Sequence, residues 1–543
     1  MINNMQNIKS LVKDAFPFKE FRPHQQETII KIIESLKGSK KFILLDAPTG
    51  SGKSAIGITV AKFFKNAFYL TSSKILQDQL MKDFGSPQIQ DLKGRNAYEC
   101  VAYDVFPQIN SPKPKEYVSC AEGFCKRNGD SKCGFCVPDG QIPICPYFDQ
   151  LDKAKSANIC IMNFSSFLFQ SLTDNFENRE LMIIDEAHNT ESQILSFVSL
   201  VLTDGGLDLK IPDYKTAKEY HDWMIDENLV EIIKTKIEEA HDKEDLKEQE
   251  NWENCLFKIE RFICSDPSEW VCEYSHIDKK HKIGKVELKP IFANKYAEDC
   301  LFKRSEKFLL MSATILSSKN ICEMLGITKD NVEYIEMPNL FPTKNRPIFF
   351  MPSGSMSFST RDRTLPKMLK KIEEICQSNH KNQKGVIHTN SFFISDYVYE
   401  NCSTNLRKRL FYSKSNSFED QFLNSSSREK TLQAFEMSND GILIGPSWHE
   451  GIDLKDDLSR FSIICKVPFP NFTSNKQLEA RMKLSQEYYA YITALKLVQS
   501  YGRSIRNETD WAITYVLDSD FERFISRSGH LLPKWFTEAI EGI

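Results

Sequence analysis

The sequence has no long apolar run, since no segment approaches the roughly 20 consecutive apolar residues that cross a membrane. Its first residues, Met1-Ile-Asn-Asn, also lack the basic stretch and apolar core of a secretory signal. We therefore expect an intracellular, cytoplasmic protein with no membrane partner.

Charge of one sign is also lacking. The chain carries 70 Lys and Arg against 74 Asp and Glu, which gives a formal net charge of −4. No global basic field indicates a nucleic-acid partner, so any such surface would be a local groove.

Cysteine, in contrast, is abundant and clustered. The chain has 15 cysteines in 543 residues, and six of them fall between Cys100 and Cys145. In a reducing compartment this clustering favours a metal site or a metal cluster over disulfides.

The length of the chain predicts several domains, about three or four.

A phosphate-binding loop follows an early apolar run. Lys41-Phe-Ile-Leu-Leu-Asp46 predicts a buried parallel strand, and Ala47-Pro-Thr-Gly-Ser-Gly-Lys-Ser54 follows directly. Glycines in this loop let backbone N–H groups approach a triphosphate, and a helix beginning at the serine favours the anion. Lys53 is expected on the β- and γ-phosphates and Ser54 on Mg²⁺. The pattern predicts ATP binding.

Residues 5–37 read as helical, with Phe21-Arg-Pro-His-Gln-Gln-Glu27 in the middle. Arg22 and Gln25 precede the phosphate loop, and a glutamine there could read the adenine edge through both its amide groups. The alternative is a solvated helix start.

A second apolar run, Leu181-Met-Ile-Ile184, ends in Asp185-Glu-Ala-His188. A pair of acidic residues at the end of a strand, downstream of a phosphate loop, is where an ATPase needs it. We expect Asp185 to hold Mg²⁺ and Glu186 to polarise the attacking water.

The cysteine-rich stretch at residues 93–149 breaks this α/β pattern. Its hydrophobic periodicity is weak, so we expect an inorganic centre to hold it together. Cys133-x-x-Cys136 suits a tetrahedral zinc ion, and an iron–sulfur cluster also needs four thiolates with looser spacing. The spacing alone does not separate the two.

Residues 195–300 read as an inserted, mainly helical domain that contains an acidic helical stretch from Glu219 to Glu253. A linker rich in Pro, Ser and Gly is predicted from Pro342 to Pro366. Strand-like runs then follow, beginning at Gly385, Gly441 and Phe461, and they predict a second α/β block.

Near the end, Gln499-Ser-Tyr-Gly-Arg-Ser-Ile-Arg506 closes a predicted helix. Arg503 and Arg506 are three residues apart and share one helix face. Their place after the other elements suggests that both reach the γ-phosphate from a second domain, as arginine fingers. A surface arginine pair is the alternative.

The order of these motifs resembles a superfamily 2 helicase. FRPHQ, APTGSGKS, LTSS, DEAH, SAT, HTNS, GPSWHEGID and QSYGRSIR occur in the expected sequence, and KGRNAYEC and CPYF flank the cysteine segment as in the XPD/DinG branch. The resemblance covers essentially the whole chain and is closer to the compact archaeal XPD form.

This resemblance implies an α/β fold with two RecA-like parallel-sheet motor domains, an inserted Fe–S cluster domain and an inserted mainly helical Arch domain. The implied boundaries are 1–92, 150–195 and 301–335 for the first motor, 93–149 for the cluster domain, 196–300 for the Arch-like insertion and 336–543 for the second motor.

The resemblance also implies ATP, Mg²⁺ and a 4Fe–4S cluster as cofactors. The expected catalytic residues are Lys53, Asp185, Glu186, Gln499, Arg503 and Arg506. Ser54 and Asp185 are expected to bind Mg²⁺. The expected ATP-binding residues are Arg22, Gln25, Ala47, Pro48, Thr49, Gly50, Ser51, Gly52, Lys53, Ser54 and Asp453. The cluster ligands are expected to be Cys100, Cys120, Cys125 and Cys145, with Cys133 and Cys136 as alternatives for the middle pair.

The implied activity is ATP-dependent 5′–3′ translocation on single-stranded DNA with duplex unwinding, in DNA repair resembling nucleotide excision repair. The expected partners are single-stranded DNA, single-strand/duplex junctions and repair-complex proteins. The enzyme itself is expected to be a monomer associated with the nucleoid. Two alternatives are a DNA-stimulated translocase without strand separation and a scaffold in a repair complex. Candidate DNA contacts are Thr71, Ser72, Lys93, Arg95, Tyr98, Thr389, Asn390 and Trp448.

Overall fold

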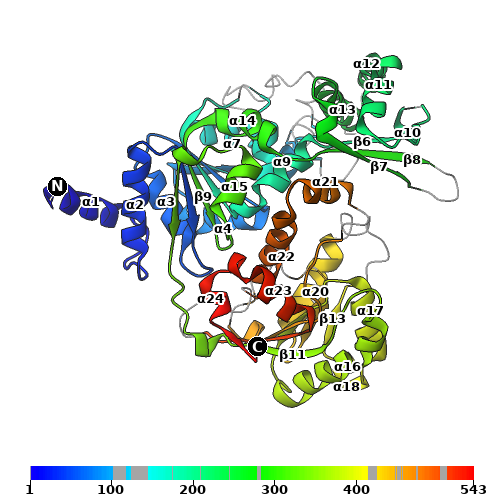
Figure 1. Ribbon diagram of the computed structural model, residues 1–543. Helices are drawn as coiled ribbons and strands as arrows, with labels where there is room; N and C mark the ends of the chain where they lie inside the picture. The colour runs from blue at the N-terminus through cyan, green and yellow to red at the C-terminus, as the bar shows by residue number, and fades with distance from the viewer. Residues whose placement is uncertain are drawn as a thin grey trace.

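Two seven-stranded sheets organise the computed structural model of the chain (Figure 1), and a three-stranded sheet accompanies the first. The structure describes residues 2–101, 118–123, 145–173, 175–207, 209–243, 245–277, 283–413, 425–446, 448, 454, 456–471, 475–501 and 510–542. The fold is α/β with two RecA-like halves, as the sequence predicts.

The first sheet has the order β10-β1-β9-β5-β2-β4-β3, and all its strands are parallel. Because parallel strands are covered on both faces, they read as continuous apolar runs. The strands are β1 (Phe42–Asp46), β2 (Ala67–Thr71), β3 (Ile89–Leu92), β4 (Ile159–Asn163), β5 (Arg179–Asp185), β9 (Ser305–Ser312) and β10 (Val332–Glu336).

Helices cover both faces of this sheet. They are α1 (Ile2–Ala15), α2 (Gln25–Lys37), α3 (Lys53–Ala61), α4 (Lys74–Phe84), α7 (Pro146–Ser156), α8 (Phe164–Gln170), α9 (Thr190–Val198), α14 (Asn294–Cys300) and α15 (Ser318–Leu325). The helical region predicted at 5–37 is interrupted between α1 and α2. Pro23 and His24, whose φ is 62°, lie in this break, because proline and left-handed backbone do not continue a helix.

The insertion predicted at 196–300 contains helices and also an antiparallel sheet of order β6-β8-β7, which the sequence analysis missed. Its acidic stretch is helical, as predicted, and is divided among three helices. The elements are β6 (Leu200–Thr203), α10 (Asp204–Leu207), α11 (Ala217–Asp226), α12 (Leu229–Asp242), α13 (Leu246–Ile263), β7 (Trp270–His276) and β8 (Gly284–Pro290). Residues of this insertion join the hydrophobic core on one face of the first sheet.

The second sheet has the order β13-β14-β12-β15-β16-β11-β17 and is also parallel. Its first strand lies inside the segment predicted as a linker, so that prediction was wrong. The strands are β11 (Ile348–Gly354), β12 (Gly385–His388), β13 (Leu410–Tyr412), β14 (Ile442–Gly445), β15 (Phe461–Ile464), β16 (Ile513–Asp518) and β17 (Ile540–Glu541).

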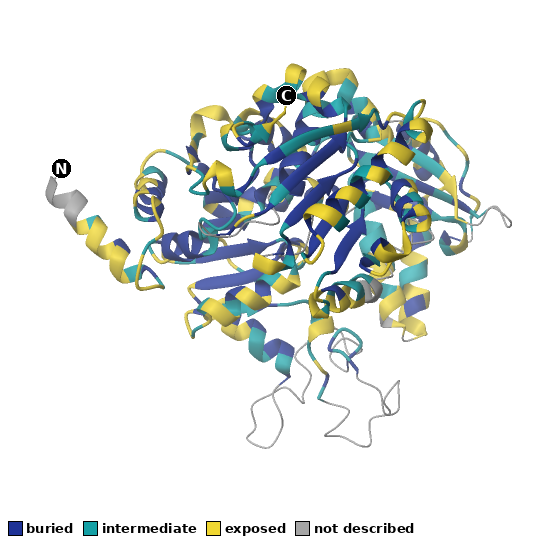
Figure 2. Cartoon of the chain, turned by 90° about the horizontal axis from the view of Figure 1, so that it is seen from below, coloured by how far each residue is buried: buried dark blue, intermediate teal, exposed yellow. Residues whose placement is uncertain are grey.

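Helices surround the second sheet. They are α16 (Arg361–Glu374), α17 (Phe392–Asn401), α18 (Thr404–Arg407), α20 (Ser425–Met437), α21 (Lys476–Leu484), α22 (Gln486–Tyr501), α23 (Asp520–Ser528) and α24 (Lys534–Thr537). Two of them, α21 and α22, also contact the first part of the chain. Figure 1 shows α21 beneath the small sheet and α22 between the two large ones. Seen from below, buried strands run between partly exposed helices (Figure 2).

Candidate functional site

The phosphate loop joins β1 to α3 with two glycines in left-handed backbone. Gly50 has a φ of 81° and Gly52 a φ of 80°, which side chains other than glycine rarely adopt. A Cβ on Gly52 would lie 2.3 Å from Nε2 of Gln25, so the close approach also requires glycine. The Ser51 hydroxyl is buried without a hydrogen-bond partner. An orphaned donor beside a glycine loop fits an anion such as phosphate.

Gln25 and Arg22 hold this loop from the start of α2. Nε2 of Gln25 donates to the carbonyls of Ser51 at 3.1 Å and Gly52 at 3.3 Å, and its Oε1 accepts from the Arg22 backbone at 2.9 Å. The Arg22 guanidinium donates to the Gly50 carbonyl. Both amide groups of Gln25 are therefore engaged with the protein, and they face the loop in place of the adenine edge that the sequence suggested.

The residues expected to hold Mg²⁺ meet at one tyrosine. The hydroxyl of Tyr69 donates to Oδ2 of Asp185 at 3.4 Å and also hydrogen-bonds Ser54. Burial, together with the neighbouring Glu186, raises the pKa of Asp185 to about 6, and Lys53 opposes this shift. A carboxylate and a hydroxyl are oxygen ligands that Mg²⁺ prefers, so these residues fit the ion in chemistry.

Glu186 is held in strained backbone at the end of β5. Its φ of 52° is left-handed, which costs roughly 1–2 kcal/mol for a residue with a side chain. Its Oε2 lies 3.4 Å from Nδ1 of His188, and this nitrogen lies 2.7 Å from the Ser312 hydroxyl and 3.3 Å from that of Thr314. The DEAH and SAT motifs therefore form one polar cluster, which would couple the acidic end of β5 to β9.

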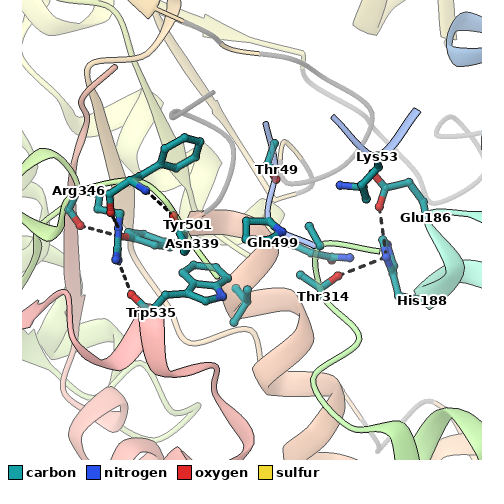
Figure 3. A pocket seen from close by; sticks show the side chains of 14 residues that line it. Thr49, Lys53, Glu186, His188, Thr314, Asn339, Arg346, Gln499, Tyr501 and Trp535 are labelled. Carbon is teal, nitrogen blue, oxygen red and sulfur yellow. Dashed lines mark hydrogen bonds and ion pairs between the residues drawn. The ribbon is translucent and has the colours of Figure 1, made fainter. Parts of the chain in front are cut away.

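A pocket lies between the two large sheets (Figure 3). Lys53, Glu186 and His188 lie at one end, Gln499 of α22 lies near the middle, and Arg346, Tyr501 and Trp535 lie at the other. The lining residues are Pro48, Thr49, Lys53, Glu186, His188, Ala313, Thr314, Asn339, Phe341, Arg346, Val498, Gln499, Tyr501 and Trp535. Both halves therefore contribute to one cleft. The expected residues Arg503, Arg506 and Asp453 lie outside the described residues.

The far end of the pocket is built around Arg346, which the sequence analysis missed. Its side chain is 3% exposed, and it donates to the carbonyls of Phe341, at 2.9 Å, and Trp535. The Tyr501 hydroxyl donates to the Arg346 carbonyl at 2.6 Å. These residues come from three separate segments. Only Tyr501 lies in a motif, QSYGRSIR, and no local pattern marks Arg346.

Three of the expected cluster ligands converge. Cys100, Cys120 and Cys145 are each buried, and Sγ of Cys120 lies 3.8 Å from Sγ of Cys145. The pKa of the Cys120 thiol is raised, first by the hydrogen bond with Cys145 and then by burial. Cys125, Cys133 and Cys136 lie outside the described residues. Within the part of the chain that is described, no group of three or more His, Cys, Asp or Glu side chains has the geometry to hold a metal ion.

Three of the candidate DNA contacts are buried. Thr71 and Thr389 are fully buried, and their hydroxyls pair with the Ser73 carbonyl at 3.0 Å and the Ser395 hydroxyl at 2.7 Å. Trp448 is 4% exposed, and its indole N–H donates to the Ile444 carbonyl at 3.0 Å. Because these side chains are already paired within the protein, they stabilise strand ends and core instead of facing a strand of DNA.

The other five candidates remain partly exposed: Ser72, Lys93, Arg95, Tyr98 and Asn390. Arg95 lies over the Tyr147 ring at 4.8 Å, and Lys93 forms an ion pair with Asp78. Asn390, in left-handed backbone, donates to the Lys466 carbonyl at 2.7 Å.

Asp46 is a further buried carboxyl group beside the phosphate loop. We predict that Asp46→Asn changes the free energy of unfolding in a pH-dependent way. Burial raises the pKa of Asp46 to about 6, against hydrogen bonds from Tyr334 and Leu316. The folded state thus holds a proton up to about pH 6 and the unfolded chain only to about pH 4, so the free energy of unfolding falls as pH rises through this window.

The asparagine variant lacks this titration. The free energy of unfolding of the variant, relative to that of the parent, should therefore rise by on the order of 2 kcal/mol between pH 4 and pH 6. Above pH 7 the difference between the two proteins should stay constant. Melting temperatures of both proteins at pH 5 and pH 7.5 measure the difference. An equal difference at both pH values would contradict the prediction.

Comparisons with known proteins match both halves of the chain. Residues 372–539 match the helicase C-terminal domain, and residues 18–221 match the Res subunit of type III restriction enzymes. A probable ATP-dependent helicase of Methanocaldococcus jannaschii is 22% identical over 96% of this chain and 95% of its own length. The solved structure of an XPD helicase aligns with a TM-score of 0.64 at 16% identity, covering 95% of this chain and 99% of that one. The matched domains and these similar proteins support an ATP-dependent superfamily 2 helicase of the XPD/DinG type.

Other similar proteins of this helicase type agree with the fold. Xpd4 of S. tokodaii aligns with a TM-score of 0.56 at 14% identity, over 96% of this helicase and 99% of that chain. The ATP-dependent DNA helicase CHL1 of Debaryomyces hansenii is 24% identical over 53% of this helicase, which spans about 39% of that protein. Among the described residues, no helix is both long and apolar enough to cross a bilayer.

Proposed function

We propose that this helicase moves 5′ to 3′ on single-stranded DNA and separates the duplex at single-strand/duplex junctions, in DNA repair of the nucleotide-excision kind. The observation that carries the proposal is the cleft with Lys53 and Glu186 on one sheet and Gln499 on the helix of the other. A triphosphate in that cleft would contact both halves, so its hydrolysis would change their separation.

Each of the expected catalytic residues then has a role. Lys53 would contact the phosphates, Ser54 and Asp185 would hold Mg²⁺, and Glu186 would orient and polarise water. Mg²⁺, when bound, would neutralise charge on the transferred phosphate. Gln499, with Arg503 and Arg506 farther along the same segment, would contact the γ-phosphate from the second half.

DNA as the substrate is supported by the relatives named DNA helicases and by the position of the partly exposed candidates. Ser72 follows β2 and Asn390 follows β12, each at the carboxyl edge of its sheet. In this proposal the boundaries keep the predicted values, with 93–149 as the cluster domain and 196–300 as the Arch-like insertion, and the enzyme acts as a monomer near the nucleoid.

Strand separation on directional substrates tests the function. A duplex with a 5′ single-stranded tail should be unwound with ATP and Mg²⁺, and one with a 3′ tail should not. Lys53→Ala should abolish unwinding, since it removes the phosphate contact. Unwinding from the 3′ tail alone would overturn the direction.

ATP-driven displacement of a protein block from single-stranded DNA without unwinding would favour the translocase alternative. Loss of both activities in a protein that hydrolyses no ATP would favour a scaffold.

For the cysteine segment we propose a 4Fe–4S cluster on Cys100, Cys120, Cys125 and Cys145, and zinc is the competing centre. The thiol chemistry fits both centres. The buried thiols of Cys100, Cys120 and Cys145, with Sγ of Cys120 3.8 Å from Sγ of Cys145, would supply three of the four ligands that either centre needs.

Metal analysis of protein purified without oxygen should give about four irons and four sulfides per chain, with a broad absorbance band at about 400 nm. Cys145→Ser should lose the iron, whereas Cys264→Ser, at an exposed cysteine, should retain it. Serine variants of Cys133 and Cys136 would test the middle ligands. One zinc without sulfide would overturn the cluster and leave the motor unaffected.

A further inference from the structure

Two exposed phenylalanines and one arginine form a stack on the second half of the helicase. Phe358 is 82% exposed and Phe393 is 43% exposed. The guanidinium of Arg361 lies over both rings, with its Cζ 4.5 Å from the Phe358 centroid and 4.2 Å from the Phe393 centroid. We call these three residues the aromatic stack. Large apolar side chains held in water in this way indicate a surface that binds something.

The stack is held firmly by the structure beneath it. Met356, two residues before Phe358, is 2% exposed, and its backbone N–H donates to Asp518 at 3.2 Å. The hydroxyl of Ser355 donates to Asp520 at 2.7 Å, and the Thr360 hydroxyl donates to the Ser355 carbonyl at 2.9 Å. A surface ring on an anchored loop loses little conformational freedom on binding, which favours affinity.

The position of the stack points to the path of a nucleic-acid strand. Phe358 and Arg361 follow β11, and Phe393 follows β12 by way of Asn390. Both strands are parallel, so their following segments lie at one edge of the second sheet. The stack therefore sits on the same edge as Asn390, a partly exposed candidate DNA contact.

The charges of the stack also fit a polyanion. Nε of Arg361 is buried without a hydrogen-bond partner, and the nearest carboxylate, on the exposed Asp362, lies 3.4 Å away as an ion pair. Arg363 is exposed beside it. Every nucleobase has a flat π face, so two rings and a guanidinium would bind unpaired bases without regard to sequence.

We propose that Phe358, Arg361 and Phe393 form a base-stacking platform for the single-stranded DNA on which the helicase moves. The proposal rests on the proposed function, because it assumes that DNA crosses the second half. Phe358 stacks on an unpaired base, Arg361 keeps both rings in place, and Phe393 supports the guanidinium from the other side.

Binding of a 20-nucleotide oligo-dT and of an abasic strand of equal length, followed by fluorescence anisotropy, tests the platform. Phe358→Ala should raise the Kd for oligo-dT roughly five- to a hundredfold and leave the Kd for the abasic strand unchanged. Phe358→Trp should retain the parent affinity. Since Phe358 is mostly exposed, its variants should fold, and an unchanged melting temperature checks this.

The matched control is Trp511→Ala. Trp511 is also exposed with an arginine over its ring, Arg460 at 5.1 Å, but it precedes β16 and so lies at the opposite edge of the same sheet. Its variant should bind both strands like the parent.

The binding experiment distinguishes failure of the proposed function from failure of the base-stacking platform. If the parent binds neither strand, the proposed function fails. If the parent binds oligo-dT and Phe358→Ala binds it equally, or weakens both strands equally, the platform alone is overturned. A change of oligomeric state in Phe358→Ala with unchanged DNA binding would also overturn it, in favour of a second copy of the chain on this surface.

Discussion

Glu186→Gln should lower the rate of ATP hydrolysis by roughly 10²- to 10⁴-fold, while nucleotide binding stays close to that of the parent. The carboxylate lines the cleft at the end of β5 and is oriented by His188 at 3.4 Å. Glutamine keeps the shape and the contact but cannot accept a proton from water. Phosphate release with single-stranded DNA present measures the rate, and a fluorescent ATP analogue measures binding.

Glu180→Gln provides the matched control. Glu180 lies at the other end of β5, where its Oε2 accepts from the Lys65 backbone at 2.6 Å, and this variant should hydrolyse ATP at the parent rate. A Glu186→Gln enzyme that kept more than about a tenth of the parent rate would show that another group polarises the water.

The sequence predicted the strands that carry the phosphate loop and the DEAH motif, because each is a buried apolar run ending in a distinctive motif. It missed β11, because Pro347 directly before the strand and Pro352 within it make the segment resemble a linker. The structure accommodates Pro352 where the register with β16 shifts between Phe350 and Gly354. A proline is tolerated at such an irregularity because no ladder hydrogen bond is required there.

The site was predictable where its residues are close in sequence and not where they meet only in space. Gln499 was found because it belongs to a motif, whereas Arg346 and Trp535 occur in ordinary surroundings and meet only through folding. Among the DNA candidates, Thr389 and Trp448 have suitable chemistry, but burial removes them from a surface. Burial depends on packing between distant segments, which a local pattern does not record.

An ion pair between the two halves was also not predicted, because its residues are distant in sequence. Breaking this ion pair should strongly destabilise the helicase. Arg481 of α21 and Glu191 of α9 are 3% and 7% exposed, and the guanidinium donates to both carboxylate oxygens at 2.8 and 2.9 Å. Burial raises the pKa of the Glu191 carboxyl, and Arg481 offsets only part of this rise. The two-pronged geometry indicates an ionised pair, since each oxygen accepts a hydrogen bond.

Arg481→Ala should reduce stability by about 3–5 kcal/mol, because the carboxylate of Glu191 would remain buried without its partner. For a chain of 543 residues this corresponds to a fall of roughly 3–4 °C in melting temperature. Lys319 and Glu487 form the matched control, since they join α15 to α22 at 3.8 Å with both side chains about half exposed. Glu487→Ala should cost less than about 1 kcal/mol. Equal losses in the two variants would contradict the prediction.

A double apolar variant, Glu191→Leu with Arg481→Met, separates stability from coupling. Apolar side chains of similar size often replace a buried ion pair at no cost in stability, so this protein should melt close to the parent temperature. The pair, however, lies between α9, just after the acidic end of β5, and α21, which precedes the helix that carries Gln499. If the hydrogen-bonded ion pair sets how the two halves close, the stimulation of ATP hydrolysis by DNA should fall in the double variant although its stability is restored. Full stimulation would mean that the pair serves packing alone.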